Sequence, residues 1–274
     1  MLRPPFRAPE NSRIVVQMGE QPALSVDGVV KSFGAVHAVD EATFDVEAGS
    51  LTCLIGPNGA GKSTLLHCVA GFLRHDSGRI LLGADDVSPW SSDRRARAGL
   101  ATVFQTATPV GGLDVLGNAM VGCHAWTRHG FATGILRTPG QRREEKDIRA
   151  AADEALELVG LAPLAHRSAT TLPFGQLRLL AIARVLAQRP RVLLLDEPVA
   201  GLRAAEKARL RDVFLDLKAR GFTQILVEHD MQFVGAVADR VLVLDRGKLI
   251  ADGPPSAIRS DERVIAAYLG TATV

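Results

Sequence analysis

From residue 24 to about residue 104, the apolar positions alternate between strand-like and helix-like spacing. Residues 24–30 and 42–46 partly alternate polar and apolar side chains, which is typical of strands with one buried face. The apolar run 51–55 leads into a glycine-rich loop, and residues 61–72 carry apolar side chains at helical spacing. This order of strands and helices predicts an α/β fold. Two further short strands are predicted at 79–82 and 100–104.

A mostly helical insert interrupts this pattern between residues 106 and 189. Residues 122–142 mix Gly, Arg, Thr and Pro without a period, and helical spacing begins at Gln141. A second helix is predicted at 175–188. It ends there because Pro190 prevents its continuation. The apolar face of the first helix contains Ile148, Ala151, Ala152, Ala155, Leu156 and Val159.

The last third of the chain returns to alternating strands and helices. The apolar run 192–195 is typical of a strand buried on both faces, and Gly221 ends a helix predicted at 204–220. We therefore predict one domain over residues 24–270, with a flexible extension at 1–23 and a short tail at 271–274. The remaining predicted elements are strands at 224–227 and 241–244 and two short helices within 254–269.

The composition fits a packed protein and narrows the classes of function. Of 274 residues, 47% are hydrophobic and 23% charged, and the formal net charge of +2 argues against a dedicated nucleic-acid binder. Cys53, Cys68 and Cys123 form no C-x-x-C pair, so we expect buried, reduced thiols. No signal peptide is visible in residues 1–22, and no apolar run approaches the roughly 20 residues that span a bilayer. We expect a soluble chain that acts at a membrane only through a partner.

The glycine-rich loop after the run 51–55 fits the phosphate-binding pattern G-x-x-x-x-G-K-[ST]. Glycines let backbone N–H groups approach a polyphosphate closely, and a following helix N-terminus favours its negative charge. Lys62 would reach the β- and γ-phosphates of ATP, and the Ser63 hydroxyl would ligate Mg²⁺. The predicted nucleotide-binding residues of this loop are Gly56, Pro57, Asn58, Gly59, Ala60, Gly61, Lys62, Ser63 and Thr64.

A pair of carboxylates follows the apolar run 192–195. Asp196 would hold Mg²⁺ directly or through water, and Glu197 would orient and deprotonate the attacking water. Such a pair at the end of a strand could also cap a helix. Together with the phosphate loop, it indicates a site for ATP hydrolysis.

With these motifs in this order, the chain resembles ABC-type ATPases over residues 24–270. The resemblance implies a P-loop NTPase (RecA-like) core, an N-terminal antiparallel β part and an inserted helical subdomain. It implies that Phe33 stacks on adenine and that Gln105 contacts the metal and the water beside the coupling surface. It also implies that His229 contacts the γ-phosphate and acts in catalysis with Glu197, Lys62 and Gln105. The signature loop, which would face a partner's ATP, is Leu172, Pro173, Phe174, Gly175 and Gln176.

This Leu-Pro-aromatic-Gly-Gln loop is similar to that of one ATPase subunit of bacterial branched-chain amino acid uptake systems. The segments 122–142, 250–254 and 264–270 resemble the same group. Related systems transport urea, amides or aromatic acids, so the sequence leaves these compounds as alternative cargoes. Two residues depart from the usual pattern. Pro173 lacks the hydroxyl and N–H of the usual serine, and Arg203 stands where the family usually has Asp or Asn.

The resemblance also implies partners. The phosphate loop of one ATPase subunit faces the signature loop of a second, which can be another copy or a different chain. Transmembrane permeases would receive the movement, a periplasmic solute-binding protein would act indirectly, and the chain would lie on the cytoplasmic face of a bacterial inner membrane. Pro173 either makes one of the two ATP sites slow or is benign.

Two other functions stay open. The first is an ABC-type ATPase without a membrane partner, acting in translation or DNA repair. The second is a P-loop regulator or kinase, which would not explain Gln105, the 172–176 loop and His229 in this order.

Overall fold

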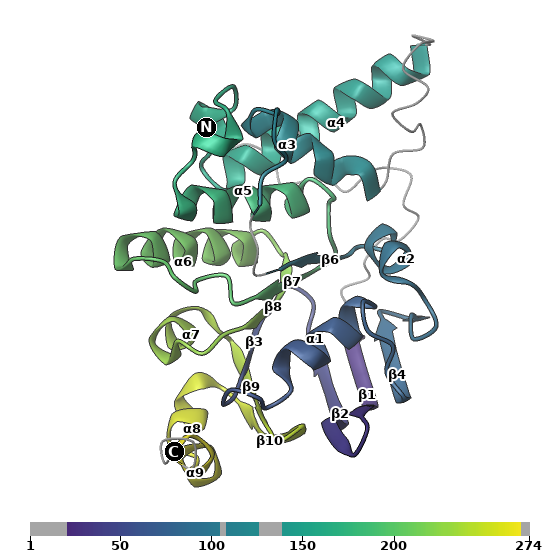
Figure 1. The fold of residues 1–274 in the computed structure, drawn as a ribbon, viewed down its shortest axis with the longest axis vertical. Helices are drawn as coiled ribbons and strands as arrows, with labels where there is room; N and C mark the ends of the chain where they lie inside the picture. The colour runs from purple at the N-terminus through teal and green to yellow at the C-terminus, as the bar shows by residue number, and fades with distance from the viewer. Residues whose placement is uncertain (1–20, 105–107, 126–138, 270–274) are drawn as a thin grey trace.

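The computed structural model describes residues 21–104, 108–125 and 139–269 (Figure 1). Near the N-terminus, an antiparallel sheet has the strand order β2-β1-β4-β5. Its first two strands form a hairpin in which Leu24 pairs with Val46 and Phe33 with Val36. Apolar residues alternate with polar ones along both strands, so one face of this sheet is buried. The strands are β1 (Leu24–Phe33), β2 (Val36–Val46), β4 (Ser77–Leu82) and β5 (Asp85–Asp86).

A second, larger sheet has the order β10-β9-β3-β8-β7-β6 and is parallel except for β10. Every residue of β3, β7 and β8 is buried, as expected for the central strands of a covered parallel sheet. The carboxyl ends of these strands meet at one edge, where open α/β sheets bind ligands. The strands are β3 (Leu51–Ile55), β6 (Leu100–Val103), β7 (Val192–Asp196), β8 (Thr223–Val227), β9 (Arg240–Asp245) and β10 (Lys248–Gly253).

Helix α1 (Lys62–Ala70) packs between the two sheets. Its residues Leu65, Leu66 and Val69 share one core with the inner faces of both sheets. Because apolar side chains hold α1 on opposite sides, its first turn has a fixed position at the ligand-binding edge.

The opposite face of the large sheet packs against helices α3 to α9 through a second core. Helices α3, α4 and α5 gather at one end of the molecule, beyond α6, and their sequence lies between β6 and β7 (Figure 1). These helices are α3 (Val115–Val121), α4 (Pro139–Leu158) and α5 (Phe174–Leu186). The other helices are α2 (Ser92–Arg97), α6 (Ala204–Ala219), α7 (Met231–Val237), α8 (Pro255–Arg259) and α9 (Glu262–Leu269).

The predicted α/β class, with an antiparallel part and a helical subdomain, is confirmed. The hairpin strands are longer than predicted, because Gly34 takes a left-handed φ of 60° and turns the chain directly between them. Helices α2, α3 and α7 and strands β5 and β10 were not predicted, since each is too short for a clear period. Helix α4 begins at Pro139 rather than Gln141, and residues 126–138 of the predicted irregular stretch lie outside the described part.

Three further expectations concern the whole chain. Cys53, Cys68 and Cys123 are buried free thiols, as predicted. Most of the predicted extension 1–23 and the whole tail 271–274 lie outside the described residues. Within the described ranges, no helix combines the length and apolar character needed to cross a bilayer.

Candidate nucleotide-binding and hydrolysis site

Two glycines allow the phosphate loop to pack closely on the neighbouring backbone. Gly56 has a φ of 151°, and a Cβ there would lie 2.0 Å from the carbonyl oxygen of Leu244. Gly61 has a φ of 102°, and a Cβ there would lie 2.0 Å from the carbonyl oxygen of Ala38. Only glycine fits at such distances. The loop therefore lies flat against β9 and the hairpin and leads into α1.

Lys62 lies across the phosphate loop. Its side chain is buried, and Nζ donates hydrogen bonds to the carbonyl oxygens of Gly56 at 2.8 Å and Pro57 at 2.9 Å. Burial lowers the pKa of Lys62, and the nearby carboxylates of Glu197 and Asp196 oppose this by favouring the charged form. The loop thus contains a cation held beside the backbone that would surround a polyphosphate.

Asp196 ends β7 opposite the first turn of α1. Burial raises the pKa of its carboxyl, and the charge of Glu197 adds to this, while a hydrogen bond from Ser63 opposes it. Its Oδ1 atom is buried without a hydrogen-bond partner among the described residues. Buried carboxylate oxygens normally have partners, and Mg²⁺ prefers oxygen ligands. The Asp196 carboxylate and the Ser63 hydroxyl therefore fit a Mg²⁺ ion.

Glu197 and His229 come together from the ends of β7 and β8. The Glu197 backbone has a left-handed φ of 46°, a conformation that typically costs about 1–3 kcal/mol for a non-glycine residue. Its N–H donates to the carbonyl oxygen of Val227 at 2.9 Å, which fixes this turn on the adjacent strand. The Glu197 carboxylate is then 3.7 Å from the imidazole of His229. The structure thus brings the two predicted catalytic side chains side by side.

The predicted signature loop lies against the segment that follows Glu197. Pro173 precedes α5, and its carbonyl oxygen accepts hydrogen bonds from the N–H groups of Gln176 and Leu177. A Cβ at Gly175 would lie 2.3 Å from Oε1 of Glu206 on α6. The Phe174 ring is half exposed. The loop therefore packs against α6 on one side and presents an aromatic surface to solvent.

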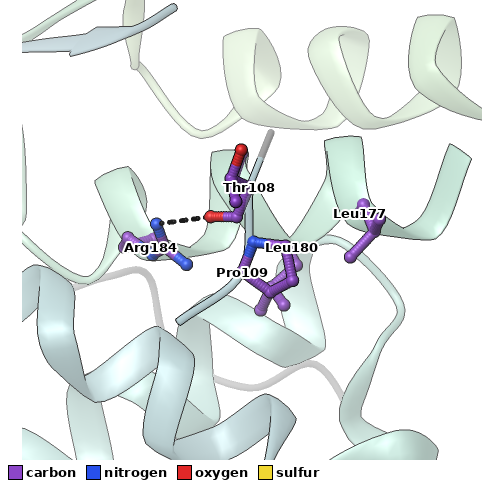
Figure 2. Close-up of a pocket in the computed structure, with 6 residues that line it drawn as sticks. Thr108, Pro109, Leu177, Leu180 and Arg184 are labelled. Atoms are coloured by element: carbon purple, nitrogen blue, oxygen red, sulfur yellow. Dashed lines mark hydrogen bonds between the residues drawn. The ribbon is translucent and has the colours of Figure 1, made fainter. Parts of the chain in front are cut away.

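Helix α5 also holds the segment that follows residues 105–107 (Figure 2). The Arg184 guanidinium donates to Oδ1 of Asn118 at 2.7 Å and to the carbonyl oxygen of Thr108 at 3.4 Å. Asn118 in turn bonds to the backbone of Val110. The signature helix is thereby tied to the connection between β6 and the helical subdomain.

Two predicted residues stand apart from this cluster. Phe33 lies at the end of β1 with 53% of its surface exposed, and Nζ of Lys31 is 5.5 Å from its ring centre. An exposed ring at the end of a strand can stack on a base. Gln105 lies outside the described residues.

The sequence analysis missed buried charged residues, among them Arg95 and Glu228. Arg95 on α2 donates to the carbonyl oxygens of Cys68 and Val69 at the end of α1. Glu228 directly precedes His229 and has no exposed surface. The only sequence signal for Glu228 is a carboxylate directly after an apolar strand, and Arg95 lies in a run of arginines with no such signal.

Comparisons with known proteins agree with this geometry. The family profile described as "ABC transporter" matches residues 39–200, which include both halves of the site. The profile described as "Branched-chain amino acid ATP-binding cassette transporter" matches residues 248–273. The chain belongs to the ATP-binding proteins of ABC transporters, in the branched-chain amino acid family. As a member of this family it is an ATPase subunit that hydrolyses ATP to drive transport.

Two curated relatives match over nearly their whole length. The high-affinity branched-chain amino acid transport ATP-binding protein BraF of Pseudomonas aeruginosa is 38% identical over 92% of this chain and 99% of its own. LivG of Escherichia coli K12, with the same description, is 37% identical over the same shares. Among solved structures, an ABC transporter ATP-binding cassette in its ADP conformation has a TM-score of 0.80 and 31% identity. That match covers 92% of this chain and 100% of the other. These matches confirm the cassette fold and the family.

Proposed function

We propose that this subunit hydrolyses Mg²⁺-bound ATP at the cluster of Lys62, Ser63, Asp196, Glu197 and His229 and thereby powers the uptake of branched-chain amino acids. The observation that supports the site most directly is the buried Oδ1 of Asp196, which lacks a partner among the described residues. A carboxylate oxygen left in this state beside a serine hydroxyl and a phosphate loop is explained by a divalent cation that arrives with the nucleotide.

Each residue has a distinct role in the proposal. The loop backbone and the Lys62 ammonium bind the phosphates, and Phe33 stacks on the base. Ser63 and Asp196 hold Mg²⁺, which supplies neutralisation of the charge that develops on the phosphates. Glu197 accepts a proton from the attacking water, and His229, 3.7 Å away, orients the reacting groups. Gln105 keeps its proposed place as a metal and water contact.

The proposed assembly rests on the resemblance to ABC-type ATPases. It implies that ATP lies between this chain's phosphate loop and the signature loop of a second cassette. We propose a different ATPase chain as that second cassette, with transmembrane permeases and a solute-binding protein completing the importer. The proposed domain comprises residues 24–270, of which 106–189 transmit the movement to permeases at the cytoplasmic face of the membrane.

The cargo is tested by transport. Membrane vesicles containing the reconstituted complex are expected to accumulate radiolabelled leucine, isoleucine or valine in an ATP-dependent manner. The same complex with Glu197→Gln is the matched control and is expected to accumulate none. Urea, short amides and aromatic acids are tested in parallel. Uptake of one of these in place of the branched-chain amino acids would contradict the proposed cargo while leaving the ATPase site intact.

A further inference from the structure

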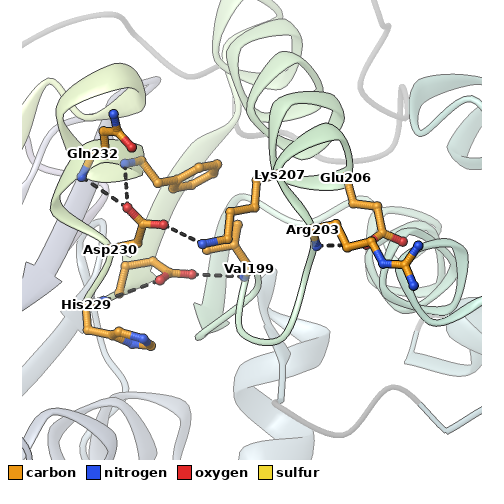
Figure 3. Close-up of polar contacts among 9 residues, drawn as sticks. Val199, Arg203, Glu206, Lys207, His229, Asp230 and Gln232 are labelled. Carbon is orange, nitrogen blue, oxygen red and sulfur yellow. Dashed lines mark hydrogen bonds and ion pairs between the residues drawn. The ribbon is translucent and has the colours of Figure 1, made fainter.

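A buried carboxylate joins the two backbone segments that carry the proposed catalytic side chains. Glu228 lies at the end of β8 with no exposed surface. Its Oε1 accepts a hydrogen bond from the Val199 N–H at 3.0 Å, and its Oε2 accepts one from the His229 N–H at 3.3 Å. Figure 3 shows this link between the loop after β7 and the strand end at His229. One side chain therefore connects the turn after Glu197 to the backbone of His229.

The turn at Glu197 is short, so the anchor at Val199 acts close to the catalytic group. The Glu197 N–H donates to Val227, and its carbonyl oxygen accepts from Ala200 at 3.2 Å. Val199 lies inside this turn and is buried. Both ends of the turn are bound to β8 or to the residue after it, so the backbone of Glu197 has a fixed position relative to that of His229.

Helix α5 carries a buried cation whose pKa responds to this carboxylate. The guanidinium of Arg178 is buried, and burial lowers its pKa, while the carboxylates of Glu228 and Glu197 both favour its charged form. Burying Glu228 raises the pKa of its own carboxyl, which the hydrogen bonds from Val199 and His229 oppose. An ionised carboxylate is costly in the interior unless charges and hydrogen bonds compensate it. The signature helix is therefore part of the environment that holds this carboxylate.

We propose that Glu228 is a positioning residue for ATP hydrolysis, whose two carboxylate oxygens fix the separation of Glu197 and His229. A glutamine at this position cannot replace it, because its amide group has one acceptor oxygen and would direct a donor at the other N–H. This inference rests on the proposed catalytic roles of Glu197 and His229. It adds a residue that does not touch the substrate.

The experiment uses the full-length chain assembled with its transporter partners. Glu228→Gln is expected to lower kcat for ATP by at least fivefold, since small misplacements of catalytic groups cost up to about 10²-fold in rate. The Kd for ATP is expected to stay within twofold of the wild type. In the nucleotide-free chain, hydrogen exchange at the Val199 and His229 amides is expected to become faster. A purely structural residue would lower Tm without separating kcat from Kd. A kcat loss smaller than fivefold in a folded Glu228→Gln chain overturns the proposal.

Two further variants separate positioning from stability. Lys207 forms an ion pair with Asp230 at 2.6 Å beside the same segment but holds no backbone N–H of the turn (Figure 3). Lys207→Gln is therefore the matched control, and an equal kcat loss there contradicts the proposal. If Glu228→Gln fails to fold, Glu228→Asp keeps the charge and both acceptor oxygens on a side chain one methylene shorter. It is expected to fold and to be at least fivefold slow, and a wild-type kcat in this variant overturns the inference.

The same assay distinguishes this inference from the site on which it rests. Glu197→Gln is measured in parallel and is expected to remove most of the hydrolysis. If Glu197→Gln hydrolyses ATP normally, the proposed site itself is wrong. If it is inactive while Glu228→Gln is normal, only the positioning role of Glu228 is wrong.

Discussion

The Nδ1 atom of His229 lies 3.7 Å from Oε1 of Glu197, although the two residues end different strands of the parallel sheet. This distance is compatible with both side chains acting on one water molecule and one phosphoryl group. The left-handed backbone at Glu197 directs its carboxylate toward this point, and the register of β7 on β8 brings His229 to it.

Loss of the Glu197 carboxylate is expected to remove most of the hydrolysis while ATP still binds. Glu197→Gln keeps the shape and removes the proton acceptor, so kcat should fall by about 10²–10⁴-fold while the Kd for ATP stays near the wild-type value. The measurement pairs steady-state hydrolysis with equilibrium binding of ATP in the presence of Mg²⁺. Normal turnover in the assembled transporter would remove Glu197 from its role.

Loss of the Lys62 ammonium is expected to weaken the binding of ATP. Lys62→Ala removes the cation that lies across the phosphate loop, so ATP binding should weaken by at least tenfold. The matched control is Lys207→Ala, because Lys207 pairs with Asp230 and contacts no residue of the loop in this structure. Equal affinities for ATP in the wild type and in Lys62→Ala would contradict the proposed phosphate contact.

The sequence predicted the parts of the site whose chemistry is local in the chain. The phosphate loop and the Asp196–Glu197 pair follow apolar strands directly, so residue type and spacing were sufficient. Glu228 and Arg95 were not predictable in this way, because their partners are distant in sequence. Val199 lies 29 residues from Glu228, and Cys68 lies 27 residues from Arg95. Burial of such charges depends on tertiary packing, which no local period reveals.

The charge at Asp196 is expected to destabilise the nucleotide-free protein. Burial raises the pKa of this carboxyl in the folded state. The ionised form therefore lowers the free energy of unfolding at a pH above the folded-state pKa. This loss of stability disappears as the pH falls below the ordinary aspartate pKa of about 3.9. Asp196→Asn should therefore raise Tm at pH 7 in the absence of Mg²⁺, and the gain should shrink as the pH approaches 4. Thermal unfolding across this pH range, with EDTA present, checks the prediction.

Asp230 provides a control of opposite sign. The hydrogen bond from Lys207 holds the pKa of Asp230 below its usual range, so its charged form stabilises the folded state at neutral pH. Asp230→Asn should lower Tm at pH 7, and the difference from the wild type should fade as the pH drops through the folded-state pKa. If Asp196→Asn lowers Tm at pH 7 as Asp230→Asn does, the ionised Asp196 carboxylate does not destabilise the folded protein.

Arg95 is expected to stabilise α1, the helix that carries Lys62 and Ser63. Its guanidinium satisfies the carbonyl oxygens of Cys68 and Val69 at the end of that helix, where a positive charge is favourable. Arg95→Met removes the charged donor from both carbonyl oxygens, although that of Cys68 still accepts from the Gly71 N–H at 3.2 Å. We expect the free energy of unfolding to fall by about 1–3 kcal/mol. Arg97→Met is the control, because its exposed ion pair with Asp93 contributes less than about 1 kcal/mol. Urea denaturation of both variants measures the difference, and similar losses would contradict the capping role.

The departure at Pro173 leads to the last prediction, that the two ATP sites of the proposed heterodimer are unequal. Pro173 offers neither a hydroxyl nor an N–H, and loss of one preorganised donor at a developing charge typically costs about 10²–10³ in rate. Helix α5 still begins directly after Pro173, and the first N–H groups of a helix have no partner within it, so nucleotide can bind there. The site that uses this chain's Glu197 and a serine-containing signature loop of the partner should therefore be the fast one.

Paired substitutions in the reconstituted heterodimer test this asymmetry. Glu197→Gln in this chain should remove most of the ATP hydrolysis, whereas the equivalent change in the partner should remove much less. Pro173→Ser should restore a donor and raise turnover at the slower site, which is measured in the complex that carries Glu197→Gln. The benign alternative, in which backbone groups carry the whole contact, predicts equal losses from the two glutamine variants and no gain from Pro173→Ser. Equal losses would therefore contradict the asymmetric assignment and favour two equivalent sites.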